Sequence, residues 1–471
     1  MARAAARLES LGIPTMIVTR QGFSQVVKNG FAGLGFPPDG PTIHEFPNEM
    51  FDEGSDLTPI NENIDKIVYG LTKWEPEIKV PGVYAPPKIT VEGTDYRDTL
   101  ENLNRLFLQN QWSDGLPLQP ATEERVSWIL SGTDLPRDTV VGAGKILPKG
   151  GIASMEYVSV ALAMAGGRPE YLPLLAAAVE AMMGLNPQTF NPTTCSVMPA
   201  FVVNGPIAKQ VRLNSGYGCL GPDPLHPAGA SIGRALRLIL QDMGGAIPGT
   251  GTMAIYGGPS RYTNYVFAED EEGLPEGWPS LAEELGFAKG ANVVSATTIN
   301  SAVNILWYFG TKELNEFTLS HVAKIMTSPN INWAISHASG LGGGSTTTAG
   351  LVLFPRGFAN SLAEANGYSK SDMKTFLWDR ATIPWSYFID MLEARGRPLD
   401  SYTFVDEEQD QKMTPTPEDI RVVVAGGDQS GHGYWMQPFN MALVSAEIKV
   451  PANWDALLKE AEEDLGPLPG A

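Results

Sequence analysis

The sequence predicts an α/β protein with mixed sheets and glycine-rich loops, in which a small N-terminal α/β remnant precedes a larger α/β domain. Three stretches lead to this prediction. Residues 2–34 alternate a helical pattern, a buried strand at 15–19 and a second helical pattern. Residues 201–245 combine a short apolar strand, a glycine-rich loop and an amphipathic helix. Residues 419–425 form a buried strand that leads into a glycine-rich turn at 426–433.

Composition limits the class of protein. A length of 471 residues predicts two or three domains, and 43% hydrophobic with 18% charged residues fits an extensive core. A net charge of -20 argues against a nucleic-acid or anionic-membrane partner. There is no apolar run long enough to span a membrane and no signal-peptide pattern at the start, and two cysteines suggest a reducing compartment. We therefore expect a cytoplasmic protein, and we expect it to form an oligomer.

The N-terminal unit is expected to span residues 1–80, followed by a linker at 81–95 and a main domain at 96–471 that could contain two subdomains. A helix that leads into a parallel strand normally follows an earlier strand, and none precedes residues 2–10. Either another chain supplies that strand, or the sequence begins late, or the helix packs on a sheet edge.

In the main domain the pattern predicts helices at 96–109, 123–130, 155–165 and 169–183, with a strand at 139–142. Further strands are expected at 250–256, 265–268 and 293–299, and helices at 319–326 and 372–380. Residues 302–309 are apolar enough for either state. The last of these helices follows a capping box formed by Ser369 and Asp372.

The helix in the central stretch is the clearest element of the sequence. Its apolar stripe consists of Ile232, Ala235, Leu236, Ile239, Leu240 and Met243, and Gly244 and Gly245 end it. The amides of the preceding glycine-rich loop, including Gly216 and Gly218, together with the helix N-terminus predict a site for an anion or a carboxylate. The loop formally matches G-x-G-x-x-G, but prolines at 222, 224 and 227 prevent a helix from opening directly after it. It is therefore no strong nucleotide-binding signature, and glycines needed for positive φ angles explain it better.

The two cysteines are candidate nucleophiles, because a thiolate near a positive dipole is reactive. Cys195 lies just before a predicted strand, and a small buried residue is the other interpretation. Cys219 lies in the glycine-rich loop, where we expect it to be accessible. With Asp223 and His226 it could form a Cys–His pair or a metal site, whereas His226 could also serve only as a hydrogen-bonding partner of the backbone. A metal ion is accordingly a possible cofactor.

Several polar residues are candidate catalytic or substrate-binding groups. Asp114 could contact a substrate or a metal, or bond its own turn. Arg234 and Arg237 could each hold a carboxylate, or form ordinary salt bridges. The remaining candidates for substrate binding are Asn204, Ser345 and Thr346 in a glycine-rich segment at 342–348, and Asp428 and His432 in the turn after the last buried strand.

Taken together, several segments resemble the UGSC family of (seleno)proteins. They are Leu-Glu-Ser-Leu-Gly-Ile-Pro-Thr at 8–15, Trp-Ser-Asp-Gly-Leu-Pro at 112–117, Gly-Arg-Pro-Glu-Tyr at 167–171, Asn-Gly-Pro at 204–206, Ile-Gly-Arg-Ala at 232–235 and Val-Val-Ala-Gly-Gly at 423–427. That family is named for a Sec/Cys-Gly-Ser-Cys motif upstream of the first of these segments. This chain has no such motif. The resemblance implies a redox-active dithiol or selenol–thiol site, which a short partner chain could supply.

These observations lead to three hypotheses. The first is an enzyme, or a large enzyme subunit, that acts on a small polar or anionic organic molecule where the loops named above converge. The resemblance implies thiol-linked reduction or carbon–heteroatom bond cleavage, which favours an oxidoreductase or a lyase over a hydrolase. The second is a metal-assisted hydrolase or hydratase that uses the Cys219, Asp223 and His226 loop. The third is a non-catalytic partner subunit of a chain that bears the redox motif.

Overall fold

The computed structural model describes residues 2–9, 11–33, 36, 42–51, 54–73, 88–194, 197–306, 308–328, 350–386, 390, 409–429 and 431–468. It is a mixed α/β structure, as the sequence predicts. In these residues no helix has the length and apolar character that crossing a membrane requires.

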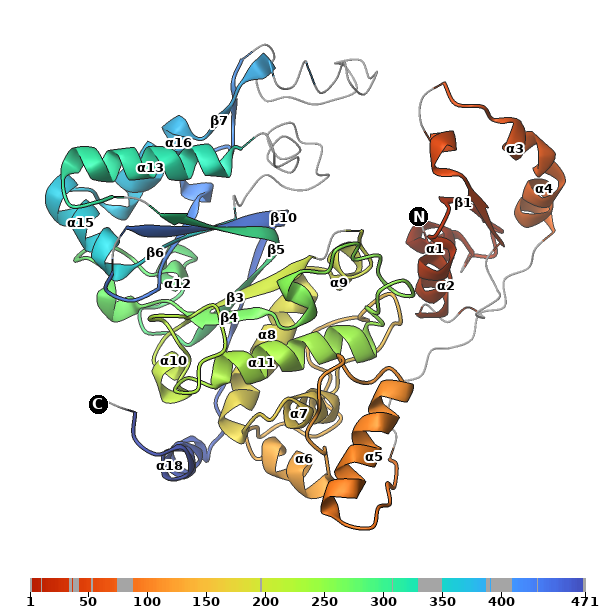
Figure 1. Cartoon of the computed structure of the whole chain (residues 1–471), viewed down its shortest axis with the longest axis horizontal. Coiled ribbons are helices and arrows are strands. Elements are labelled where there is room, and N and C mark those ends of the chain that lie inside the picture. Colours follow the sequence, from red (N-terminus) through yellow and green to blue (C-terminus); the bar gives the residue numbers. More distant parts are fainter. Residues whose placement is uncertain are drawn as a thin grey trace.

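A six-stranded mixed sheet forms the centre of the main domain (Figure 1). Its strand order is β4-β3-β5-β10-β6-β9. The strands are β3 (Met198–Asn204), β4 (Tyr265–Ala268), β5 (Val293–Leu306), β6 (Leu351–Phe354), β9 (Arg421–Val424) and β10 (His432–Glu447). The long central strands β5 and β10 pair antiparallel, and bulges near Pro438 and Asn440 shift the register close to its middle.

The two halves of this sheet share one plan. In the first half β3 is parallel to β4 and antiparallel to β5, and in the second half β6 is parallel to β9 and antiparallel to β10. In each half a helical segment connects the two parallel strands, and a long strand follows. The residue after each second strand bonds in the same way, because Glu269 N donates to Val203 O and Ala425 N donates to Phe354 O. The domain is therefore built from two topologically equivalent halves that meet at β5 and β10.

The sheet curls so that its two edges approach each other. The backbone amide of Asp270, after β4, donates to the carbonyl of Val424 in β9 (2.8 Å). Inside the curl lies an apolar cluster that includes Val202, Phe267 and Met436. The edge strands β4 and β9 thus place their carboxyl ends together.

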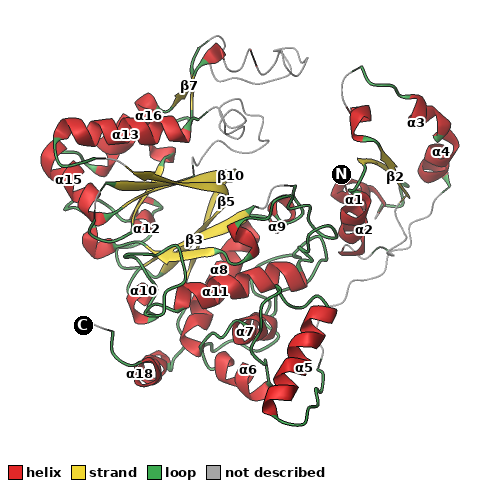
Figure 2. Ribbon diagram, viewed as in Figure 1, coloured by secondary structure: helices red, strands yellow, loops and turns green. Residues whose placement is uncertain are grey.

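Helices cover the outer face of the curled sheet, with one layer over each half (Figure 2). One layer consists of α7 (Met155–Met164), α8 (Leu172–Gly184) and α11 (Ala228–Leu238), against which α5 (Tyr96–Gln109) and α6 (Glu123–Leu130) pack. The other consists of α13 (Lys312–Met326), α15 (Arg356–Asn366) and α16 (Lys370–Arg380). Shorter elements are α9 (Pro187–Phe190), α10 (Ile207–Gln210), α12 (Leu281–Glu284), β7 (Thr382–Ile383), β8 (Gln411–Lys412) and the last helix, α18 (Trp454–Leu465).

The helix caps were predictable from sequence. Thr122 accepts a hydrogen bond from Arg125 N at the start of α6, and Ser369 and Asp372 form the expected capping box of α16. The apolar stripe at 232–243 is helical throughout, but α11 ends at Leu238. The five residues Ile239–Met243 that follow form a π-helix, η3.

Two predicted strands are wrong. Residues 139–142 contribute one isolated bridge, Val140 to Ser154, because Gly142 turns the chain with a φ of +70°. Residues 250–256 contribute one bridge, Pro248 to Thr252, and Ala254 has a φ of +40° that interrupts an extended run. In contrast, the ambiguous residues 302–306 extend β5.

The N-terminal unit contains a separate two-stranded parallel sheet of β1 (Met16–Arg20) and β2 (Thr42–Phe46). Its helices are α1 (Ala2–Glu9), α2 (Ser24–Gly33), α3 (Thr58–Glu62) and α4 (Ile64–Thr72). The expected helix, strand and second helix are all present, within two residues of the predicted bounds. The proposed limits at residues 80 and 95 stay a prediction.

Candidate functional site

The glycine-rich loop that the sequence singles out uses its amides internally. Gly216 N donates to Asn214 Oδ1 (2.7 Å), and the amides of Cys219 and Gly221 donate to carbonyls of the same loop. Gly218 has a φ of +74°, which agrees with the prediction that this loop needs glycines for positive φ angles. The loop is a set of tight turns, and these three amides are not available to an anion.

The expectation that Cys219 is accessible is wrong. Its side chain is 7% exposed and packs into the apolar cluster inside the curled sheet. Burial raises the pKa of the thiol to about 12, so a thiolate is strongly disfavoured at neutral pH. Leu220 and the strands around it provide the apolar surroundings that the loop sequence alone does not reveal.

His226 and Asp223 pair with each other, since Asp223 Oδ2 contacts Nδ1 of the imidazole. Asp223 also accepts from Asn214 Nδ2 (3.0 Å). Burial acts to raise the pKa of the Asp223 carboxyl, but its bonds with His226 and with the amide of Leu225 outweigh burial and lower that pKa. In the part of the chain that the structure describes, no three His, Cys, Asp or Glu side chains gather as a metal ion would require. Cys219, Asp223 and His226 therefore do not form a metal site in this structure.

The other predicted binding residues are dispersed. Asn204 is fully buried and donates to Glu269 Oε2 (2.7 Å) at the carboxyl ends of β3 and β4. The Asp428 side chain is 74% exposed and lies 3.6 Å from Arg356 Nε. His432 is exposed at the start of β10, 3.3 Å from Asn304 Oδ1. Cys195, Ser345 and Thr346 lie outside the described residues.

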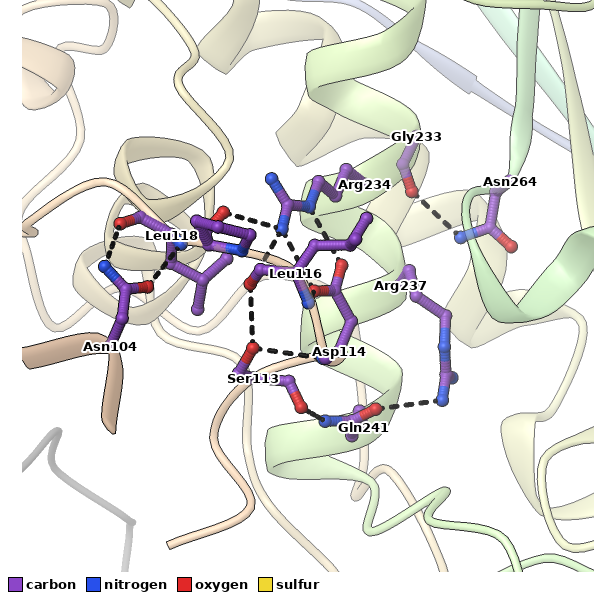
Figure 3. Close-up of polar contacts among 12 residues, drawn as sticks. Asn104, Ser113, Asp114, Leu116, Leu118, Gly233, Arg234, Arg237, Gln241 and Asn264 are labelled. Atoms are coloured by element: carbon purple, nitrogen blue, oxygen red, sulfur yellow. Dashed lines mark hydrogen bonds and ion pairs between the residues drawn. The ribbon is translucent and has the colours of Figure 1, made fainter. Parts of the chain in front are cut away.

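Asp114 and Arg234 form a salt bridge with each other (Figure 3). This agrees with the simpler interpretation of each residue, a turn aspartate for Asp114 and an ordinary ion pair for Arg234. Arg234 donates from Nε to Asp114 Oδ2 (2.8 Å) and from Nη2 to Asp114 Oδ1 (3.0 Å). The Asp114 side chain is only 2% exposed, and it also accepts from Leu116 N (3.1 Å) within its own turn. The two-pronged ion pair fastens the 112–117 loop to α11.

A second contact from the same helical segment holds this loop. Gln241, in η3, donates from Nε2 to Ser113 O (2.9 Å), and its Oε1 accepts from Arg237. Trp112, next in the loop, packs edge-on against Phe107 of α5, with ring centroids 6.4 Å apart. The α11–η3 segment thus positions the indole of Trp112, which forms part of a cavity wall.

That cavity has a volume of about 510 Å³, which suits a small organic molecule. It lies among α5, α6, α7, the 88–91 segment and η3, and we call it the α5–α7 cavity. Its walls are mainly aliphatic and aromatic, with contributions from Leu103, Phe107, Trp112, Val126, Val160 and Met164. The ionisable side chains that line it are Lys88, Tyr96, Glu123, Lys149, Glu156, Tyr157 and Asp242.

Asp242 is the most unusual of these groups. It is 5% exposed, and its Oδ1 has no hydrogen-bond partner in the structure. Burial raises the pKa of its carboxyl to about 8, although the cations of Lys149 and Arg237 act in the opposite direction. At neutral pH the carboxyl is therefore protonated and can donate a hydrogen bond or a proton.

Lys149 lies beside Asp242 and donates from Nζ to the Asp242 backbone carbonyl (2.7 Å). Lys149 as a whole is exposed, so solvent partly screens the charge of its amine. Partial burial against the cavity still lowers the pKa of the amine, and the neighbouring Asp242 opposes that effect. Glu156, on the first turn of α7, is 30% exposed and lies 3.3 Å from Arg137 Nη1. The carboxyl groups of Asp242 and Glu156, in different surroundings, and the amine of Lys149 therefore line the same apolar cavity.

The sequence predictions missed Lys149, Glu156 and Asp242. For Asp242 the sequence does contain a signal. Asp242 follows Ala235 of the apolar stripe by seven residues, about two helical turns, so it is expected beside the buried face of the helix. A charged residue at such a position is rarely buried without a role. The π-helix was not readable from the sequence, although such turns are frequent at functional sites.

Comparisons with protein-family models, with curated proteins and with solved structures find no match to this chain.

Proposed function

We propose that the chain is an enzyme, or the large subunit of one, that acts on a small organic molecule bound in the α5–α7 cavity. The observation that supports this most directly is the Asp242 carboxyl, which is buried, unpartnered at Oδ1 and lines the cavity, and whose pKa burial raises. Buried polar atoms are almost always hydrogen-bonded. A polar atom of a ligand would satisfy this one.

The cavity walls also define the class of substrate. Aliphatic and aromatic side chains favour a molecule with an apolar body, and Asp242 and Lys149 favour an oxygen-bearing polar end next to them. A carbonyl or carboxyl oxygen could accept from both groups. We therefore narrow the expected polar or anionic substrate to an amphipathic one.

The groups present suit carbon–heteroatom bond cleavage by proton transfer. In this proposal Glu156 removes a proton from the carbon next to the carbonyl while Lys149 stabilises the negative charge that develops on the carbonyl oxygen. The bond to the heteroatom then breaks, a carbon–carbon double bond forms, and Asp242 gives its proton to the leaving group. Exchange with water restores the ionised Glu156 and the protonated Asp242. The reaction is a lyase reaction and needs no other reactant.

The test uses medium-chain β-hydroxy, β-amino and β-alkylthio acids and esters, with the unsaturated product measured by mass spectrometry. Replacing Asp242 with Asn keeps the shape of the side chain but removes the acidic proton that Asp242 would transfer. We therefore expect turnover to fall on the order of 100-fold or more. Glu124→Gln is the matched control, because Glu124 is an exposed carboxylate in the same helix as Glu123 and is not part of the cavity. Equal turnover by the Asp242→Asn variant and the parent chain would contradict the assignment.

The N-terminal unit supports a second candidate, a partner subunit for a chain that bears the redox motif of the UGSC family. In the described residues its parallel sheet has two strands, fewer than an independently stable sheet usually needs. On α4, Ile64, Val68 and Leu71 recur on one face and are each close to half exposed. Thiol-linked reduction would belong to such a complex, and family membership is part of this proposal.

This candidate predicts that the chain alone aggregates or binds an apolar dye through the N-terminal unit. Replacing Ile64 and Val68 together with Gln should reduce that dye binding. A monodisperse chain that binds no dye would contradict the partner-subunit candidate and leave the lyase proposal unaffected.

A further inference from the structure

A second, much smaller cavity lies on the other side of the α11–η3 segment. Its volume is about 20 Å³, and the two cavities share no lining residue. The polar residues around it are Asn191, Arg237, Thr252, Arg261 and Asn264. We call it the arginine cavity. Figure 3 shows Arg237 on the side of α11 that faces Asn264, while Arg234 reaches toward the 112–117 loop.

Arg237 is the first reason to regard this cavity as a binding site. The residue is 3% exposed, and its hydrogen bonds come from one nitrogen, Nη2, to Gln241 Oε1 (3.2 Å) and Ala246 O (2.9 Å). Its Nε is buried without any partner. A guanidinium has five N–H donors, so most of its donor capacity is unused.

Arg261 is the second reason. Its Nη1 donates to the same carbonyl, Ala246 O, at 3.0 Å. The two terminal nitrogens of Arg237 and Arg261 thus lie within about 6 Å of each other, since both bond one oxygen atom. Like charges at this distance repel, and the repulsion and burial lower the pKa of Arg237 to about 9.

In the described residues these two cations have little countercharge, since the charge of Asp114 attracts both and that of Asp242 attracts Arg237 without bonding to either. Neither Arg237 nor Arg261 forms an ion pair with a carboxylate there. Asp114 is occupied by Arg234 in a two-pronged pair, and Asp242 is protonated at neutral pH. A buried pair of guanidiniums that bonds to no carboxylate costs free energy that a bound anion would recover.

We propose that the arginine cavity binds a free oxyanion of carboxylate size, such as formate, between Arg237 and Arg261. A volume of about 20 Å³ exceeds what one water molecule needs and excludes a bulky ligand. Two guanidinium groups with unused, planar donors match the geometry of a carboxylate. The site is distinct from the α5–α7 cavity and does not depend on the function proposed for it.

The test is a titration of the full chain with sodium formate at constant ionic strength, with chloride as the balancing ion. We expect a saturable rise in melting temperature and a calorimetric binding isotherm with one site. Arg261→Gln should weaken formate binding at least tenfold, and Arg261→Lys should recover only part of it because lysine lacks the planar fork. Arg97→Gln is the control, since Arg97 is 88% exposed and pairs with Glu101 far from the cavity.

Benzoate distinguishes a free anion from the carboxylate end of a larger ligand. Formate binding that benzoate neither matches nor displaces would support the proposal. Binding of benzoate without formate would overturn it, and so would formate binding that Arg261→Gln leaves unchanged or a melting temperature that responds to formate no more than to chloride. Circular dichroism of each variant verifies the fold, and Arg261 is chosen because it is less deeply buried than Arg237.

Discussion

Burial has opposite consequences for the reactivity of two residues in this chain, Asp242 and Cys219. The same loss of solvation raises the pKa of Asp242 to about 8 and that of the Cys219 thiol to about 12. For the carboxyl, the neutral form is the useful one, because it can donate a proton inside a cavity. For the thiol, the neutral form is inert, because the thiolate is the nucleophile. Sequence reasoning identified Cys219 by residue type, but its reactivity depends on neighbours that only the fold brings together.

The raised pKa of Asp242 predicts how stability depends on pH. Between about pH 4 and pH 8 the folded chain holds a proton on this carboxyl that the unfolded chain has lost, so the unfolding free energy falls as the pH rises through that window. The contribution of this one proton is at most about 1.4 kcal/mol per pH unit. Chemical denaturation of the parent chain and of Asp242→Asn should show a smaller pH dependence in the variant. Parallel curves would contradict the raised pKa.

The buried thiol gives a second prediction at this scale. Folded protein treated with iodoacetamide at pH 8 should leave Cys219 almost unmodified, whereas protein in denaturant should react fully there. Peptide mass spectrometry locates the modification, and the denatured sample is the control. Rapid native labelling of Cys219 would restore it as a nucleophile candidate, and Cys219→Ala with lost turnover would then confirm that role.

At the scale of elements, the segment formed by α11 and η3 organises the candidate site. It contributes Arg234 and Gln241 to the 112–117 loop, Asp242 to the α5–α7 cavity and Arg237 to the arginine cavity. The apolar stripe predicted this helix, and the sequence also identified Asp114 and Arg234. The switch to a π-helix after Leu238 was not predictable, because its hydrogen-bond pattern depends on tertiary packing and not on hydrophobic period.

Replacing Arg234 with Met tests the clamp between α11 and the loop. The variant leaves the Asp114 carboxylate buried without its partner, so we expect a loss of roughly 3 kcal/mol of unfolding free energy, the lower end of the range for breaking a buried ion pair. Trp112 should also become more mobile, which a red shift of its fluorescence would report. Arg97→Met, in an exposed pair, should cost less than about 1 kcal/mol. Similar losses in both variants would contradict the clamp.

At the scale of the whole molecule, the main domain is two equivalent halves closed by contacts between their strand ends. Alternation and glycine-rich turns predicted the α/β class and the strands that became β3, β4 and β9. The equivalence was not predictable, because it lies in strand order and pairing, which hydrophobic pattern does not encode. For the same reason the cavity between α5 and α7 could not be located from residues that are distant in sequence.

The closure between the halves can be tested at Arg356. Its guanidinium donates to both carboxylate oxygens of Asp270 at 2.8 Å, and so joins α15 of the second half to the end of β4 in the first. Replacing Arg356 with Gln should lower the unfolding free energy by about 1 to 2 kcal/mol, since the pair is partly exposed. Hydrogen exchange should increase at Asp270 N, which bonds Val424 O. Unchanged exchange there would show that the edges are held by other contacts.

The proposed lyase reaction depends on a protonated Asp242 carboxyl in the α5–α7 cavity. The most direct measurement is a pH titration of the folded chain, followed by carboxyl carbon NMR with the Asp242→Asn variant used to assign the signal. We expect an apparent pKa near 8 that is absent from the variant. An Asp242 carboxyl that titrates near the ordinary aspartate value of about 4 would rule out its role as the proton donor, because it would be an anion at neutral pH with no proton to give.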